Sequence, residues 1–188
     1  MAQTKIKAGG FDADVITGTT ALAEQPASTD EIIISDGGTL KRLDFDHVFA
    51  TPSFRVILSS NQSIGTGSTT KITFDSETWD SSGTFASNKF TPAVAGKYLI
   101  VLGGRISGFT DAEEFQLLFY KNGSALNFGQ AKIVSAGTNG LFLAQQATII
   151  ESLDDDDYIE GYVHQNTGSN ADLVATHTFM TGFKLIGV

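Results

Sequence analysis

Four consecutive aspartates form the densest group of potential ligands in the sequence. Carboxylate oxygens are hard ligands that suit calcium, and an oligomer that brings three copies of one loop together would strengthen a cation site. The spacing is not that of an EF-hand, and aspartate also favours solvated turns. The sequence therefore predicts either an acidic turn or calcium ligation, and no other cofactor, at the four positions Asp154, Asp155, Asp156 and Asp157.

Three histidines, His47, His164 and His177, are the candidate general bases. A hydrolytic triad needs a nucleophile, a base and a carboxylate at hydrogen-bond distance, and no serine lies in a Gly-x-Ser-x-Gly elbow. If His164 and His177 lay on adjacent strands, neighbouring carboxylates would complete a metal or acid–base site, and otherwise they are ordinary polar strand positions. We predict no enzymatic activity, and an unrecognised hydrolase is the third functional alternative.

Two further groups of residues have a possible chemical use. A carboxylate pair for glycoside hydrolysis would have to come from residues whose separation the sequence does not define. These are Glu113, Glu114, Glu151 and Glu160. Trp79 with Phe74 and Phe85 would form a stacking platform for a sugar if all three were exposed, and otherwise Trp79 caps a hydrophobic core.

Composition excludes several classes of partner and site. Cysteine is absent, so the chain has no disulfides, thiolate metal cages or cysteine nucleophiles. Lys and Arg total 12 against 21 Asp and Glu, and the net charge of -9 argues against binding to nucleic acid. The chain has no basic stripe for an anionic membrane, no apolar run of about 18 residues and no secretory signal at the N-terminus. We therefore expect a soluble protein that is not exported.

The residues 51–188 have the composition and patterning of an all-β domain. The sequence is 41% hydrophobic, with 20 Gly and 14 Phe, and it shows no helical period. Short apolar runs separated by turn residues predict an antiparallel β-sandwich, a jelly roll of about 8–10 strands. The expected strands are 54–59, 71–75, 85–90, 97–106, 115–120, 125–128, 141–152, 158–164 and 177–188.

Residues 1–50 differ from the rest of the chain. Residues 2–30 are small and polar and predict an extended arm. The run Asp36-Gly37-Gly38 lies between the apolar segments 31–35 and 39–45, which predicts a tight hairpin. Because two strands alone are marginal in water, the hairpin is expected to dock on a partner. The docking residues would be Ile32, Ile34, Leu40, Leu43 and Phe45.

The strand at 97–106 is apolar on both faces. Tyr98, Ile100 and Leu102 alternate with Leu99 and Val101. An antiparallel strand with one solvated face would alternate between apolar and polar residues. A second sheet is expected to cover one face, and another subunit is expected to cover the other.

Three segments resemble the tumour necrosis factor-like and complement globular-head jelly rolls. The residues 90–100, Phe-Thr-Pro-Ala-Val-Ala-Gly-Lys-Tyr-Leu-Ile, are similar to the signature that opens the central strand of that family. The segment 153–159 resembles its Leu, Gly-Asp, strand segment, and 179–186 resembles its final strand. This resemblance implies a homotrimer in which one apolar surface faces the threefold axis, and the alternative is that the same residues belong to the sandwich core. They are Leu99, Val101, Phe142, Ile150 and Ile186.

The N-terminal segments 16–22 and 30–43 resemble leader segments of bacteriophage structural proteins. The resemblance implies a virion component that assembles in the bacterial cytoplasm. We predict a trimeric capsid decoration or cement protein that binds the major capsid protein through its N-terminal arm. The alternative is a trimeric tail- or head-fibre tip that binds a host receptor or surface glycan through the loops 60–70, 76–82 and 166–172.

Overall fold

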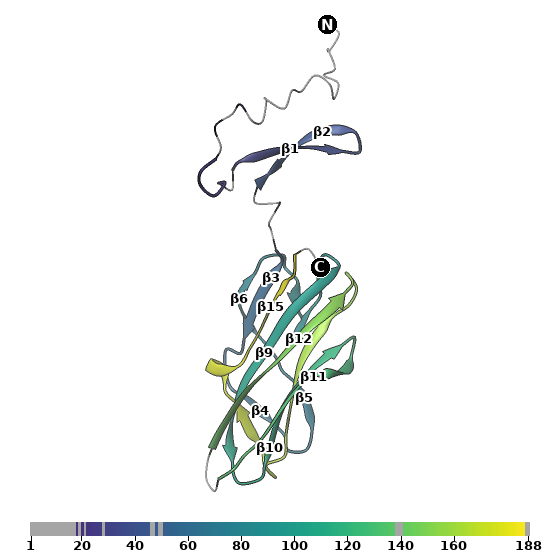
Figure 1. The fold of residues 1–188 in the computed structure, drawn as a ribbon. Coiled ribbons are helices and arrows are strands. Elements are labelled where there is room, and N and C mark those ends of the chain that lie inside the picture. Colours follow the sequence, from purple (N-terminus) through teal and green to yellow (C-terminus); the bar gives the residue numbers. More distant parts are fainter. Residues whose placement is uncertain are drawn as a thin grey trace. The chain divides into compact units, whose positions relative to one another are not determined.

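The structure is a computed structural model that describes residues 18, 20, 22–27, 29–45, 48, 51–137 and 141–186. The chain divides into two units, Met1–Ala50 and Thr51–Val188, and each is described by itself (Figure 1). His47 and most of the predicted N-terminal arm lie outside the described residues.

The first unit contains the predicted hairpin. Strand β1 (Glu31–Asp36) pairs antiparallel with β2 (Thr39–Asp44), and Ile32 lies opposite Leu43. Gly37 and Gly38 form the turn with φ angles of 56° and 84°. Both values lie in the left-handed region that glycine adopts without strain, so the local sequence dictates the position of this turn.

The second unit is an antiparallel β-sandwich with jelly-roll topology, as expected. In one sheet the long strands run in the order β12-β9-β15-β3, and in the other β11-β10-β13-β8. The chain crosses repeatedly from one sheet to the other, which is the pattern of two Greek keys. The strands are β3 (Ser53–Ile57), β4 (Gln62–Ile64), β5 (Thr69–Lys71), β6 (Ser76–Asp80), β7 (Phe85–Ala86), β8 (Lys89–Phe90), β9 (Gly96–Phe109), β10 (Glu114–Lys121), β11 (Ser124–Val134), β12 (Leu141–Leu153), β13 (Ile159–Gln165), β14 (Ala171–Leu173) and β15 (Phe179–Lys184).

The core lies between the two sheets and is rich in aromatic residues. Phe54 is fully buried and stacks on Phe90, with ring centroids 4.4 Å apart. Tyr98 is also buried, and its hydroxyl donates a hydrogen bond of 2.7 Å to the Val94 carbonyl oxygen, so its polar end is satisfied. Aromatic rings bury large apolar areas, and this chain stabilises the sandwich without disulfides.

Local turn chemistry also fixes the hairpin between β10 and β11. Asn122 and Gly123 have φ angles of 52° and 77°, as a two-residue type I′ turn requires. Asn-Gly is the residue pair that this turn type favours, so the local sequence positions the hairpin.

Several strand boundaries differ from the sequence prediction. In the predicted strand 71–75, β5 ends at Lys71, although the Ile72 amide still donates to the Gly161 carbonyl oxygen. Asp75 accepts hydrogen bonds from Ser59. Residues 85–90 form a short hairpin, since Ser87 and Asn88 adopt φ angles of 53° and 59°. The last predicted strand begins later, after a 3-10 turn at Ala175–His177 (η2), and residues 187–188 lie outside the described part.

The three predicted loops are shorter than expected because each contains a strand or the start of one. Strand β4 and most of β5 lie within 60–70, β6 lies within 76–82, and β14 begins within 166–172. These strands extend the two sheets at their ends. They are too short for an alternation of apolar and polar residues to be recognised in the sequence.

Gly182 is a tight contact in the middle of the seven-stranded sheet. A Cβ at this position would lie 2.9 Å from the Leu99 carbonyl oxygen and 3.0 Å from Cε1 of Phe54. Gly182→Ala is expected to lower the free energy of unfolding by about 1–3 kcal/mol, because backbone and core must shift to accommodate the methyl group. Urea unfolding followed by circular dichroism measures the change.

The matched control is Gly65→Ala, since a Cβ there meets nothing within 4 Å. It is expected to change the free energy of unfolding by less than about 0.5 kcal/mol. Equal stabilities of the two variants would contradict the contact at Gly182.

Candidate assembly surfaces

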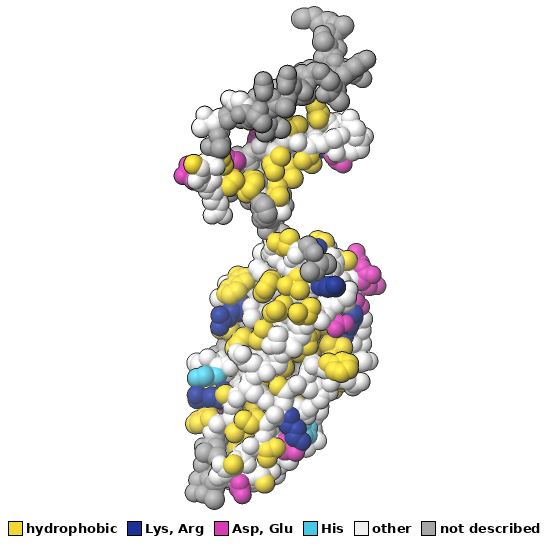
Figure 2. Space-filling view, viewed as in Figure 1, with side chains coloured by type: hydrophobic (Ala, Val, Ile, Leu, Met, Phe, Trp, Pro, Cys, Tyr) yellow, Lys and Arg dark blue, Asp and Glu magenta, His cyan; other side chains and the backbone are white. Residues whose placement is uncertain are grey.

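The outer face of the seven-stranded sheet carries a continuous apolar surface. Ile150, Leu99 and Phe183 lie side by side on β12, β9 and β15, because each is the register partner of the next. Ile150 is 60% exposed and Phe183 is 44% exposed. Figure 2 shows hydrophobic side chains gathered over these strands on the face turned to the viewer. We call this surface the apolar face.

Strand alternation places these residues outward. On β9, Tyr98, Ile100 and Leu102 are fully buried in the sandwich, so Leu99 and Val101 point away from it and are half-buried by their neighbours. On β12 the even-numbered residues, including Phe142 and Ile150, are exposed for the same reason.

None of the five residues assigned to a trimer contact belongs to the sandwich core. Phe142 is 55% exposed on β12, and Ile186 is 70% exposed just after β15. The core interpretation of Leu99, Val101, Phe142, Ile150 and Ile186 is therefore wrong. Their role in a trimer stays a prediction.

Phe128 extends this apolar surface toward the edge of the sandwich and was not predicted. It is 98% exposed on β11 and lies with Leu126, Thr148 and Ile150 around a shallow hollow of about 260 Å³. The register between β10 and β11 shifts between Leu118 and Tyr120, so inward and outward positions on β11 cannot be read by simple alternation. The only sign in the sequence that Phe128 is exposed was its position between Asn127 and Gly129.

Each face of the hairpin carries apolar residues and an ion pair. The register places Ile32, Ile34 and Leu43 on one face, together with the ion pair of Lys41 and Asp36. Phe45 follows β2, and its amide donates to the Asp30 carbonyl oxygen. Leu40 lies on the opposite face and is 77% exposed. Three of the five predicted docking residues, Ile32, Ile34 and Leu43, therefore share one face, and Leu40 does not, because its position has the other parity.

Two ion pairs link the strands of the hairpin, and large apolar side chains are exposed on both of its faces. Arg42 Nη1 lies 2.6 Å from Glu31 Oε1, and Lys41 pairs with Asp36 beside the turn. Ile32 and Ile34 are 38% and 36% exposed. Exposed ion pairs contribute little stability, so an apolar partner surface would contribute more.

The acidic run forms a turn between β12 and β13. The carboxylate of Asp157 accepts hydrogen bonds from the Asp154 amide at 2.9 Å and from Asn122 Nδ2 at 2.6 Å. It also lies 3.0 Å from Lys121 Nζ. Among the residues that the structure describes, no group of three His, Asp or Glu side chains is placed to hold a metal ion. The geometry favours an acidic turn over calcium ligation by Asp154, Asp155, Asp156 and Asp157.

These contacts make the turn sensitive to acid. The Asp154 amide, Asn122 and Lys121 together lower the pKa of Asp157 from 3.8 to about 2. Because the folded-state pKa is lowered, the stabilisation is present above pH 3.8 and is lost as the pH falls toward 2. Asp157→Asn is therefore expected to flatten the pH dependence of stability in this window.

Thermal unfolding of both proteins between pH 2 and pH 5 measures this effect. Asp155→Asn is the matched control, because no hydrogen bond or ion pair involves its carboxylate among the described residues. A control that flattens the profile as much as Asp157→Asn would contradict the assignment.

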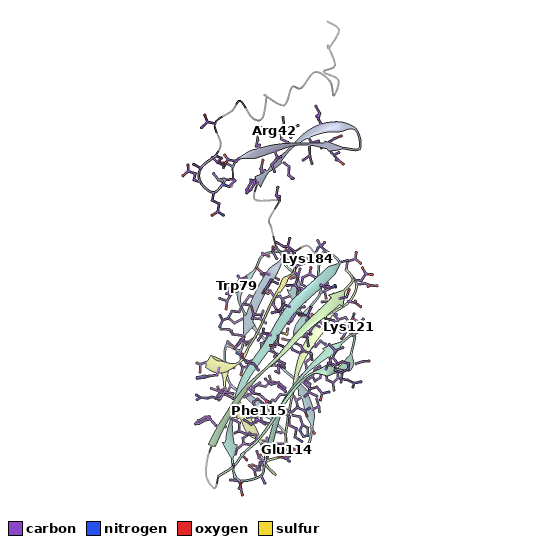
Figure 3. All side chains as sticks on the ribbon, in the orientation of Figure 1. Arg42, Trp79, Glu114, Phe115, Lys121 and Lys184 are labelled. Atoms are coloured by element: carbon purple, nitrogen blue, oxygen red, sulfur yellow. The ribbon has the colours of Figure 1, made fainter. Side chains whose placement is uncertain are left out.

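The residues of the histidine site and of the aromatic platform do not lie together. His164 lies on β13, in the six-stranded sheet, whereas His177 lies in η2 beside the seven-stranded sheet, so the two do not form one site. Phe74 and Phe85 are buried in the core and only Trp79 is exposed, at 45%. The predicted aromatic platform is therefore wrong, and Trp79 stands alone on β6 at the sheet edge (Figure 3).

The carboxylates considered for glycoside hydrolysis have structural partners. Glu160 is buried, and its Oε1 lies 2.6 Å from Lys71 Nζ. Glu151 Oε1 lies 3.5 Å from Lys121 Nζ. Glu114 pairs with Lys132, and Glu113 accepts a hydrogen bond from the Thr110 amide. These pairs tie neighbouring segments together, and the residues do not converge on one cleft.

The chain is similar to a solved structure but to no family model. No protein-family model matches the chain, and no curated protein matches it. Among solved structures, the globular domain of zebrafish complement 1qA protein is similar over 71% of this chain and 97% of its own length, at 16% sequence identity and a TM-score of 0.49. No helix among the described residues is long and apolar enough to cross a membrane.

Proposed function

We propose that the protein is a non-enzymatic structural protein of a bacteriophage virion. Its sandwich unit associates as a homotrimer through the apolar face, and its hairpin attaches the trimer to the capsid as a decoration or cement protein. The observation that supports this most is the row formed by Ile150, Leu99 and Phe183, three large apolar side chains on the outside of a sheet.

An apolar surface of this kind favours association. Burying a large apolar side chain contributes about 1.5–3 kcal/mol, and contiguous apolar patches on soluble proteins mark interaction surfaces. A permanent contact buries about 1,000 Å² or more. Phe128, beside Ile150, extends the available area to the edge of the sandwich. Closed rotational symmetry lets every copy cover this surface at once.

The hairpin supports attachment to a larger assembly. A two-stranded sheet is marginal in water unless another surface covers it. Ile32, Ile34 and Leu43 share one face, which carries more apolar residues than the other, where Ile33 and Leu40 are exposed. The absence of cysteine suits assembly in a reducing bacterial cytoplasm.

The first test is the solution mass of the full-length protein, measured by light scattering on a sizing column. The expected value is three times 20.0 kDa, with or without a chelator. A protein that elutes as a monomer at all concentrations would overturn the trimer and, with it, the decoration function.

The second test asks which hairpin face binds the capsid. An Ile34→Asp, Leu43→Asp variant is expected to lose binding to empty shells by more than about tenfold in co-sedimentation, because each charge would enter an apolar contact. The matched control is Ile33→Asp, Leu40→Asp, which places the same charges on the opposite face.

The pattern of binding separates the candidate functions. Equal losses in the two variants would contradict docking through this face. Wild-type protein that binds host cells or an array of host glycans, and does not bind shells, would favour the fibre-tip alternative.

A further inference from the structure

A groove of about 580 Å³ crosses the outer face of the seven-stranded sheet beside the apolar face. Its floor is β9 at Gly103, where the Phe179 ring lies so close that a Cβ would overlap it. Glycine at this position therefore lets the ring lie across the strand. The polar groups around the groove come from four elements, and they are Arg55 on β3, Arg105 on β9, Gln146 on β12, and Thr176 and His177 in η2.

Arg55 and Arg105 have no acidic partner among the described residues. The chain contains three arginines, and the third, Arg42, pairs with Glu31 on the hairpin at 2.6 Å. In a chain with 21 acidic residues and a net charge of -9, two unpaired guanidinium groups on one groove are a local positive site.

Aromatic rings hold both guanidinium groups in place. The Arg105 Cζ atom lies 4.2 Å from the centroid of Phe142. The Arg55 Cζ atom lies 5.2 Å from the centroid of Phe179 and 5.8 Å from that of Trp79. Cation–π contacts restrain a guanidinium group without using its N–H donors, so the donors stay available to a ligand.

The histidine beside Arg105 is also fixed. Arg105 Nη1 lies 3.2 Å from His177 Nε2, and because arginine only donates, Nε2 accepts. His177 Nδ1 then donates to Thr176 Oγ1 at 2.8 Å. The 3-10 turn that carries both residues is anchored by the Val174 amide, which donates to the Arg105 carbonyl oxygen at 2.7 Å.

Arg105 has unused donor capacity. A guanidinium group has five N–H donors, and the contact with His177 uses one. Its Nε–H is covered from solvent and has no hydrogen-bond partner in the described structure. A buried donor is stabilised by an acceptor, which a water molecule or a ligand can supply. Carboxylates and other oxyanions are the acceptors that match a guanidinium group, because two parallel N–H donors face two oxygens.

We propose that this groove binds a carboxylate or other oxyanion through Arg105 and Arg55, with Gln146 as an additional donor at its rim. The oxyanion is either a free anionic ligand or an acidic side chain of a second copy of this chain, and the chemistry is the same for both. The site does not depend on the proposed virion function.

Trp79 provides the readout, because it is the only tryptophan in the chain and contacts Arg55. Full-length protein is titrated with citrate, and its fluorescence is compared with that in sodium chloride of equal ionic strength. A saturable change is expected for citrate alone. Arg105→Gln and Arg55→Gln are each expected to weaken binding by about tenfold or more, which is the loss of one charge-assisted hydrogen bond.

The matched control is Lys132→Gln, which removes the same charge from β11 on the other sheet. It is expected to bind citrate as the wild type does. Circular dichroism melts confirm that each variant is folded, and light scattering on the same samples gives the mass.

The outcomes separate the two sources of the oxyanion. Citrate binding that both arginine variants lose, at unchanged mass, identifies a free ligand. No citrate binding by the wild type, together with a lower mass for Arg105→Gln but not for Lys132→Gln, identifies an acidic side chain of a second copy. Citrate binding that persists in the arginine variants, or no change in binding and mass in any variant, overturns the site. The wild-type mass alone tests the trimer, so failure of the groove and failure of the proposed function are distinguishable.

Discussion

The double variant Leu99→Lys, Ile150→Lys is expected to elute as a monomer of 20.0 kDa in place of the trimer proposed for the wild type. Leu99 and Ile150 are register partners on β9 and β12, so the two lysines would lie at the centre of the apolar face. Leaving one charge buried and unpaired in a contact costs about 3–5 kcal/mol, and each subunit would contribute two. Light scattering on a sizing column measures the result.

The matched control is Val134→Lys, on the outer face of the six-stranded sheet. Val134 is 49% exposed and lies opposite Glu114, so a lysine is accommodated there. This variant is expected to keep the wild-type mass. A double variant that also keeps the wild-type mass would show that the apolar face is not the contact, whatever the oligomeric state.

Phe54→Ala is expected to lower the free energy of unfolding by about 3–5 kcal/mol, the usual cost of removing a fully buried ring. Phe54 is 0% exposed and stacks between Phe90 and Phe85, with centroid distances of 4.4 Å and 5.7 Å. It also lies against the backbone of Gly182, which has no side chain to contribute to filling the cavity. Phe54→Ala is introduced into the Leu99→Lys, Ile150→Lys variant, and the stabilities with and without Phe54→Ala are compared by urea unfolding. The use of this variant removes any contribution from self-association.

Phe128→Ala in the same background is the matched control. Phe128 is 98% exposed, so removal of its ring leaves no cavity and is expected to change the free energy of unfolding by less than about 0.5 kcal/mol. Equal losses for the two phenylalanines would contradict the burial pattern of the sandwich.

Local chemistry determined the features that the sequence could predict. The turns at Gly37-Gly38 and Asn122-Gly123 need φ angles that few other residues adopt, so they were recognisable without any tertiary contact. The double-sided apolar pattern of 97–102 indicated a strand in a sandwich whose second face is also apolar, since side chains alternate along a strand whatever its neighbours are.

Tertiary structure alone decided which distant residues meet. Arg55 and Arg105 lie on one groove because β15, from the end of the chain, inserts between β3 and β9 and brings Phe179 between them. Asp157, which caps its own turn at the Asp154 amide, also meets Asn122 and Lys121 from another hairpin. Phe128 is exposed because a bulge shifts the register of β11. Each outcome depends on which strand pairs with which, and in which register, and these pairings join segments too far apart for local periodicity to reveal.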